Sequence, residues 1–116
     1  NKNLILMNNV SAEINFNYSE KITILSKKAV YNTLNYDTKF EDDIIIKYGD
    51  HNILSENVDM LFKDQRIKIY NKIEYTNLNT FLLADIAEID LLTKNLKIYM
   101  NETKKKINIT YNNDAN

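Results

Sequence analysis

The sequence is organised around residues 53–62, ILSENVDMLF, because the same pattern recurs on both sides of this stretch. Residues 24–31 read ILSKKAVY, and residues 82–91 read LLADIAEIDL. The leucine at the second position of each copy, Leu25, Leu54 and Leu83, recurs at a spacing of 29 residues. Self-similarity at a fixed period indicates a structural repeat in which each copy is one supersecondary unit that packs on its neighbours.

Each copy begins with apolar or small residues at every second position, which is the period of a β-strand. The alternation shifts by one position after Ser26, Ser55 and Ala84, and the next inward residues are Ala29, Val58 and Ala87. This shift predicts a bend or β-bulge at the same place in every copy. Residues 84–92 fit a helical stripe about as well as a strand, but their alignment with the other two copies favours a strand.

Each copy is followed by a polar turn and then by further alternating apolar residues. The predicted turns are residues 36–39, 63–66 and 93–95, and residues 48–51 and 77–79 join one unit to the next. Before the first copy, Leu4, Leu6, Val10, Ala12, Ile14 and Phe16 alternate around Asn8-Asn9, which predicts a strand pair or a bent strand. This segment looks like the tail of a unit, so we expect the chain to begin inside a larger array.

Length and composition favour a single domain over residues 1–116, since a 44% hydrophobic content can supply one core. The short strands linked by turns predict an all-β domain, a sandwich, barrel or open roll that buries its inward faces. The net charge of −1 supplies no field that would draw the chain to nucleic acid. The chain has no cysteine, so disulfides and thiolate metal sites play no part.

The polar residues do not form a catalytic or metal-binding motif. His51 is the only histidine, and its position in a predicted turn favours a surface residue. The acidic run 41–43 lacks the spacing of a calcium loop and is interpreted as a solvated hairpin end. We therefore assign no catalytic residue, no metal and no cofactor.

The whole repeat unit resembles that of the lipopolysaccharide-transport proteins that share the OstA-like β-jellyroll, the LptC and LptA family. Residues 24–31 and residues 92–100, LTKNLKIYM, are most similar to LptC, and the resemblance extends from Leu4 to Tyr111. The family places a glycine before the apolar return strand. This chain has Asn9, Asp43 and Lys72 at those places.

The resemblance implies a jellyroll of repeated antiparallel strand units, open at its ends, that holds the acyl chains of lipopolysaccharide between two sheets. It implies a non-enzymatic protein of the periplasm that is tethered to the inner membrane by a segment absent from this chain. It also implies that the first strands of the jellyroll are absent. Within that fold, the residues that face inward on the repeat's parity are the predicted lipid-binding set: Ile24, Tyr31, Ile46, Met60, Ile69, Tyr75, Ile89 and Ile98. Sequence parity does not distinguish a filled core from an open groove.

The resemblance also implies partners that extend the sheet by edge-strand pairing. These are the neighbouring LptA-like jellyroll proteins of the transport bridge and the inner-membrane transporter. The predicted edge residues are Leu4 and Leu6 at one end and Ile107, Ile109 and Tyr111 at the other.

Three alternatives remain open at this point. The chain could be an LptA-type soluble bridge protein, which shares the same repeat. It could be a carbohydrate-binding or adhesin-like β-repeat module, in which exposed tyrosines and asparagines contact sugars. An enzyme is the weakest alternative, because the repeat leaves no long loop in which to place a site.

Overall fold

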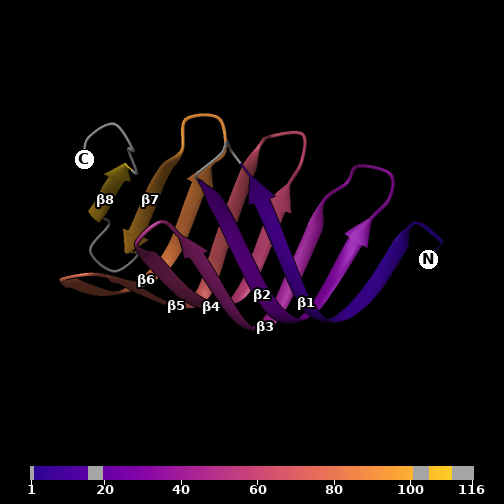
Figure 1. The fold of residues 1–116 in the computed structure, drawn as a ribbon, viewed down its shortest axis with the longest axis horizontal. Coiled ribbons are helices and arrows are strands. Elements are labelled where there is room, and N and C mark those ends of the chain that lie inside the picture. The colour runs from indigo at the N-terminus through magenta and orange to yellow at the C-terminus, as the bar shows by residue number, and fades with distance from the viewer. Residues whose placement is uncertain (1, 16–19, 101–104, 111–116) are drawn as a thin grey trace.

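The protein forms one antiparallel β-sheet in a computed structural model that describes residues 2–15 and 20–100, together with the backbone of residues 105–110. The sheet has eight strands that follow one another in sequence order (Figure 1). They are β1 (Leu4–Asn15), β2 (Lys21–Asn32), β3 (Thr38–Tyr48), β4 (His51–Leu61), β5 (Arg66–Asn77), β6 (Thr80–Asp90), β7 (Asn95–Met100) and β8 (Lys105–Thr110). No helix occurs in these ranges, so the prediction of an all-β chain is confirmed, including the strand predicted at Ala84.

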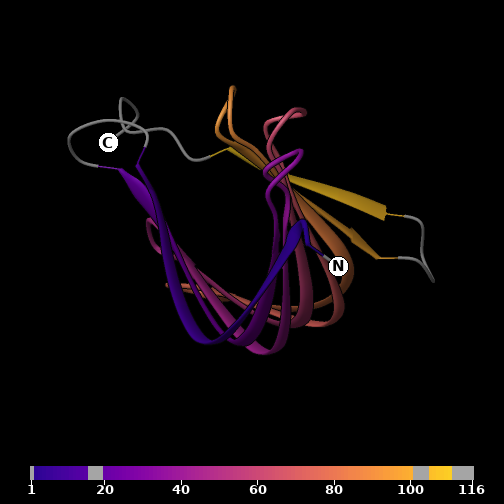
Figure 2. The ribbon, with the colours of Figure 1, turned by 90° about the vertical axis from the view of Figure 1, so that its right-hand side faces the viewer.

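The long strands are bent, so the sheet folds into a trough with two arms (Figure 2). We call arm I the part on the left of Figure 2, made of residues 10–15, 21–26, 44–48, 51–55, 73–77 and 80–84. Arm II, on the right, is made of residues 4–8, 28–32, 38–41, 57–61, 66–70, 86–90, 95–100 and 105–110. The two layers that a jellyroll-like sequence predicts as separate sheets are thus two halves of one continuous sheet.

The bends lie where the sequence pattern shifts parity, and the prediction of repeated bulges is confirmed. The register of β2 with β3 shifts between Leu25 and Lys28, and that of β4 with β5 shifts between Leu54 and Asn57. The extra residues lie on β3 and β5. These two strands take left-handed backbone angles there, as β1 does at Asn9, where the register with β2 is unshifted. Positive φ values occur at Asn9 (53°), Asp42 (70°), Asp43 (49°), Asn71 (69°) and Lys72 (58°). A left-handed residue turns the strand and moves its following side chains to the other face.

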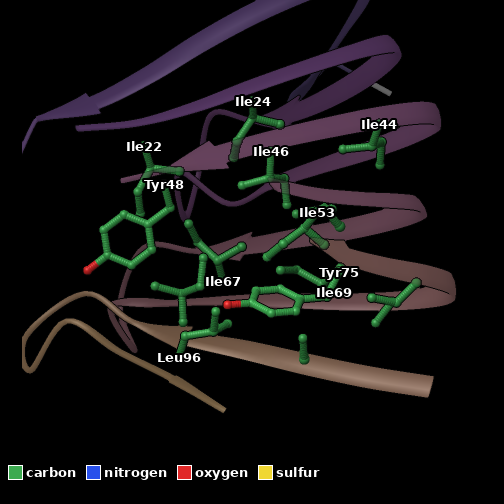
Figure 3. Packing of buried hydrophobic residues seen from close by; sticks show 14 of the residues in the cluster. Ile22, Ile24, Ile44, Ile46, Tyr48, Ile53, Ile67, Ile69, Tyr75 and Leu96 are labelled. Atoms are coloured by element: carbon green, nitrogen blue, oxygen red, sulfur yellow. The ribbon is translucent and has the colours of Figure 1, made fainter. Parts of the chain in front are cut away.

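The inward faces of both arms pack into one hydrophobic core (Figure 3). Arm I contributes Ile22, Ile46 and Tyr48, for example, and arm II contributes Ile67 and Leu96, all at 0% exposure. Burial of each such isoleucine stabilises the fold by roughly 1.5–3 kcal/mol before the cost of ordering the chain is subtracted. The trough is therefore held shut by contact between its own two arms.

The end of the chain differs from the predicted repeat. In the repeat, Ile107 and Ile109 take the places that Ile73 and Tyr75 take on the bent strand β5. Here β8 instead pairs back on β7 in the antiparallel direction, with Ile98 opposite Ile107 and Leu96 opposite Ile109. The polar sequence 101–106 between the two apolar pairs is longer than the residues at the bends of β3 and β5.

The apolar alternation of the first half of β1 does not mark its inner face. Leu6 is 77% exposed, and Met7 packs against the core instead. The cause is the left-handed angle at Asn9, which adds a parity shift that simple alternation through Asn8-Asn9 does not contain.

Substitution of Lys72 by glycine tests the left-handed bends. A residue with a Cβ atom pays about 1 kcal/mol or more in the left-handed region, and glycine does not. Lys72→Gly is therefore expected to leave the free energy of unfolding unchanged or to raise it by up to about 1 kcal/mol in urea titrations. The matched control is Lys68→Gly, at an exposed lysine on the same strand outside the bend, which should lose about 1 kcal/mol. Equal losses at both lysines would contradict a left-handed bend at Lys72.

Candidate functional site: the inner surface and mouth of the trough

The predicted lipid-binding residues all lie on the strands of the trough and divide between its arms. Ile24, Ile46 and Tyr75 lie on arm I, and the remaining five lie on arm II: Tyr31, Met60, Ile69, Ile89 and Ile98. Six of them belong to the packed core: Ile24, Ile46, Ile69, Tyr75, Ile89 and Ile98. Met60 packs against this core from its margin, and Tyr31 is half-buried.

The interior of the trough is filled with side chains. Ile24, Ile46, Ile69, Ile89 and Ile98 are each 0% exposed, so no ligand can touch them while the arms are in contact. The inner surface is accessible only where the packing thins out. One such place is the β1 edge, where Val10, Ala12 and Ile14 are half-buried, and the other is the rim of arm II near Tyr31 and Met60.

Aromatic side chains gather at the rim of arm II. The ring of Tyr36 lies 6.5 Å from that of Tyr31 and 5.3 Å from that of Phe62, in an edge-to-face arrangement with Phe62. Tyr36 and Phe62 are 50% and 54% exposed. The two hairpin turns that carry them are joined by a hydrogen bond of 2.9 Å from the Phe62 N–H to the Asp37 carboxylate. The sequence pattern placed Tyr36 in a turn and Phe62 at the end of the alternating apolar series, and it did not predict that the two rings meet.

Polar contacts join the two arms at the mouth of the trough. The Lys94 Nζ atom, in the turn between β6 and β7, lies 2.7 Å from Oε1 of Glu20, the residue before β2. The hydroxyl of Tyr48, at the end of β3, donates a hydrogen bond of 3.0 Å to the carbonyl oxygen of Lys94. The Glu20 side chain is only 2% exposed. Nothing in the sequence pattern pairs residues this far apart along the chain.

His51 does not lie on the surface as predicted. It is 4% exposed at the start of β4, and its Nδ1 atom is hydrogen-bonded to the Tyr75 hydroxyl. Its ring also lies 6.0 Å from the ring of Tyr48. Burial lowers the pKa of His51 below its ordinary value, and the Asp50 carboxylate only partly opposes this shift. Burial also raises the pKa of Tyr75. The prediction failed because His51 directly follows the turn and begins a strand whose odd-numbered residues face inward up to Ser55.

The predicted edge residues lie partly on the outermost strands. Leu4 and Leu6 are on β1, which pairs only with β2, and Ile107 and Ile109 are on β8, which pairs only with β7. Tyr111 lies outside the described residues. Both outermost strands thus present one side of their backbone away from the sheet, and partner binding there stays a prediction.

The sequence matches no protein-family model, and no curated protein matches it. In the part of the chain that the structure describes, no helix has the length and apolar character to cross a membrane. The same residues contain no cluster of histidine, cysteine and acidic side chains suited to hold a metal ion.

The buried histidine generates a prediction about acid stability. The pKa of His51 is lower in the folded protein than its unfolded value of about 6.5, so the unfolded chain binds the proton first as the pH falls. Stability should therefore be unaffected by this group above about pH 7 and should fall below about pH 6.5, by at most about 1.4 kcal/mol per pH unit. Urea titrations between pH 7.5 and 5.5 measure this slope.

The control is His51→Gln, whose amide can accept the Tyr75 hydrogen bond but does not titrate. This variant should lack the slope over the same pH range. A slope that persists in His51→Gln would show that another group, and not the buried imidazole, causes the loss of stability.

Proposed function

We propose that this protein is a β-jellyroll module of a lipopolysaccharide-transport bridge, similar to LptC, that shields lipid acyl chains without catalysing a reaction. One observation carries the proposal. The three places where the family resemblance calls for glycine are Asn9, Asp43 and Lys72, and all three have the left-handed backbone that glycine adopts most readily. The resemblance thus extends from a hydrophobic pattern to a specific backbone requirement at three separate bends.

The apolar inner surface also supports the proposal. Each methylene of an acyl chain that leaves water gains about 0.8 kcal/mol, and the inward residues are almost all aliphatic or aromatic. The core is filled, so acyl chains first contact the accessible margin at Tyr31 and Met60 and reach the deeper isoleucines only when the arms separate. The gain from burying the lipid then offsets the loss of contact between the arms.

The unpaired outer sides of β1 and β8 support the second part of the proposal, which is a place in a chain of proteins. Backbone N–H and C=O groups at a sheet edge pair readily with another strand. In the orientation that the resemblance implies, the β8 edge docks the next bridge protein and the β1 edge faces the inner-membrane transporter. The protein then acts in the periplasm.

A charge at the accessible margin of the inner surface tests lipid binding. Met60→Glu places a carboxylate against the acyl chains and should weaken binding of a fluorescent acyl lipid about tenfold or more, since an unpaired buried charge is costly. Because Met60 is half-buried, the melting temperature of the variant should stay close to that of the parent protein. The matched control is Leu54→Glu, on the same strand but on the outer face and 42% exposed, which should bind normally. Unchanged affinity in Met60→Glu would count against a lipid-binding inner surface.

Proline substitutions in β8 test edge pairing. Successive amides of a strand point to opposite sides, so of Asn108 and Ile109 one directs its N–H at β7 and the other directs it away from the sheet. The Thr110 amide points the same way as that of Asn108. Proline at a position whose amide points away from β7 should abolish binding of an LptA-type jellyroll in a biolayer assay and leave the melting temperature unchanged. Proline at the inward amide should lower the melting temperature. Partner binding that survives proline at both positions would rule out strand addition at this edge.

A further inference from the structure

Lys94, a residue of arm II, is held by two residues of arm I. Its ammonium group contacts Glu20 at 2.7 Å, and its carbonyl oxygen accepts the Tyr48 hydroxyl at 3.0 Å. Glu20 directly precedes β2 and Tyr48 ends β3 in arm I, and Lys94 lies in the turn between β6 and β7 of arm II. Both the side chain and the backbone of a single residue thus join the two arms.

The turn presents Lys94 in a fixed geometry. Lys94 has a left-handed backbone, with φ of 67°, and its N–H donates to the Asp90 carbonyl oxygen at 2.7 Å. The Asp90 carboxylate accepts hydrogen bonds from the N–H groups of Leu92 and Thr93, which lowers the pKa of that carboxyl. These hydrogen bonds within the turn fix the position from which Lys94 contacts arm I.

This ion pair differs from the others in the described part of the chain. Pairs such as Lys21 with Glu13 and Arg66 with Glu88 join neighbouring strands of one arm, and the Lys21 and Glu13 side chains are 56% and 51% exposed. Exposed pairs of that kind add little to stability. The Lys94 and Glu20 side chains are 33% and 2% exposed, so their contact is better shielded from water than the exposed pairs. Separation of the arms would break it.

We infer that Glu20, Tyr48 and Lys94 form a latch that keeps the trough closed, and that release of this latch opens the inner surface to lipid. The inference rests on the proposed function for its ligand, but the latch itself is a property of the fold. The attraction between the two charges in the closed state is partly offset by the hydration that they regain when they separate. The latch therefore adds a modest free energy to the closure that the hydrophobic core provides.

Spin labels test the latch without any lipid. The chain has no cysteine, so cysteines at Lys47 on arm I and Lys68 on arm II, both exposed on outer faces, give one defined label pair. The latch variant carries Glu20→Gln and Lys94→Met together, which removes both charges and leaves no buried charge unpaired. Methionine tolerates the left-handed turn as lysine does. Pulsed electron resonance should show a longer-distance population roughly tenfold larger than in the parent, because hydrogen bonds to charged groups are worth at least that factor.

The matched control carries Glu13→Gln and Lys21→Met, which removes an ion pair of the same chemistry within arm I. It should show the parent's distances. Tyr48→Phe removes only the hydroxyl and should give an intermediate population, so the test remains available if the double variant does not fold. Unchanged distances in a folded latch variant and in Tyr48→Phe would overturn the inference.

A cleavable cross-link then connects the latch to the ligand. In a variant that carries Glu20→Cys and Lys94→Cys, a short cleavable bis-maleimide joins the two thiols. Uptake of a fluorescent acyl lipid is then followed before and after the linker is cleaved. Uptake should be blocked in the linked protein and restored on cleavage. Equal uptake in both states would overturn the inference and leave the proposed function standing. Longer spin-label distances without lipid uptake in any variant would support the latch and refute the proposed function.

Discussion

The structure depends on the need to remove one apolar sheet face from water with no other element available to cover it. The described part of the chain has no helix, and the sheet is continuous, so its inward isoleucines can be buried only against one another. Straight strands would leave this face open. Left-handed residues at Asn9, Asp43 and Lys72 bend β1, β3 and β5. The two halves of each strand from β1 to β6 then contribute to opposite walls of the same core.

Closure of the sheet on itself creates the core and also limits access to the inner surface. The arms meet so closely that most of the predicted lipid surface is a filled interior, and the polar contacts at its mouth, from Lys94 to Glu20 and Tyr48, hold it shut. The outermost strands keep one backbone side unpaired. The proposed opening of the mouth and the proposed extension of the edges would therefore act on different parts of the molecule.

Much of this fold could be predicted from the sequence, because period and parity are local properties. The shift after Ser55 located a bend, and the alternation around it identified the residues that face inward. Contacts between the arms could not be predicted, since Glu20 and Lys94 are related by the way the bent sheet closes and not by any repeat. The buried His51 and the β7–β8 hairpin were missed for related reasons, as both depend on where a turn ends and not on the apolar period.

Nuclear Overhauser effects between a bound acyl chain and the methyl groups of the protein would show directly which face of the sheet receives lipid. An isotope-filtered experiment detects only contacts between the unlabelled lipid and the labelled protein. The trough predicts contacts to the Met60 methyl group and, once the arms part, to inward residues such as Ile69 and Ile89. Contacts confined to outward residues such as Leu54 and Leu83, in a protein that demonstrably holds the lipid, would contradict binding between the arms.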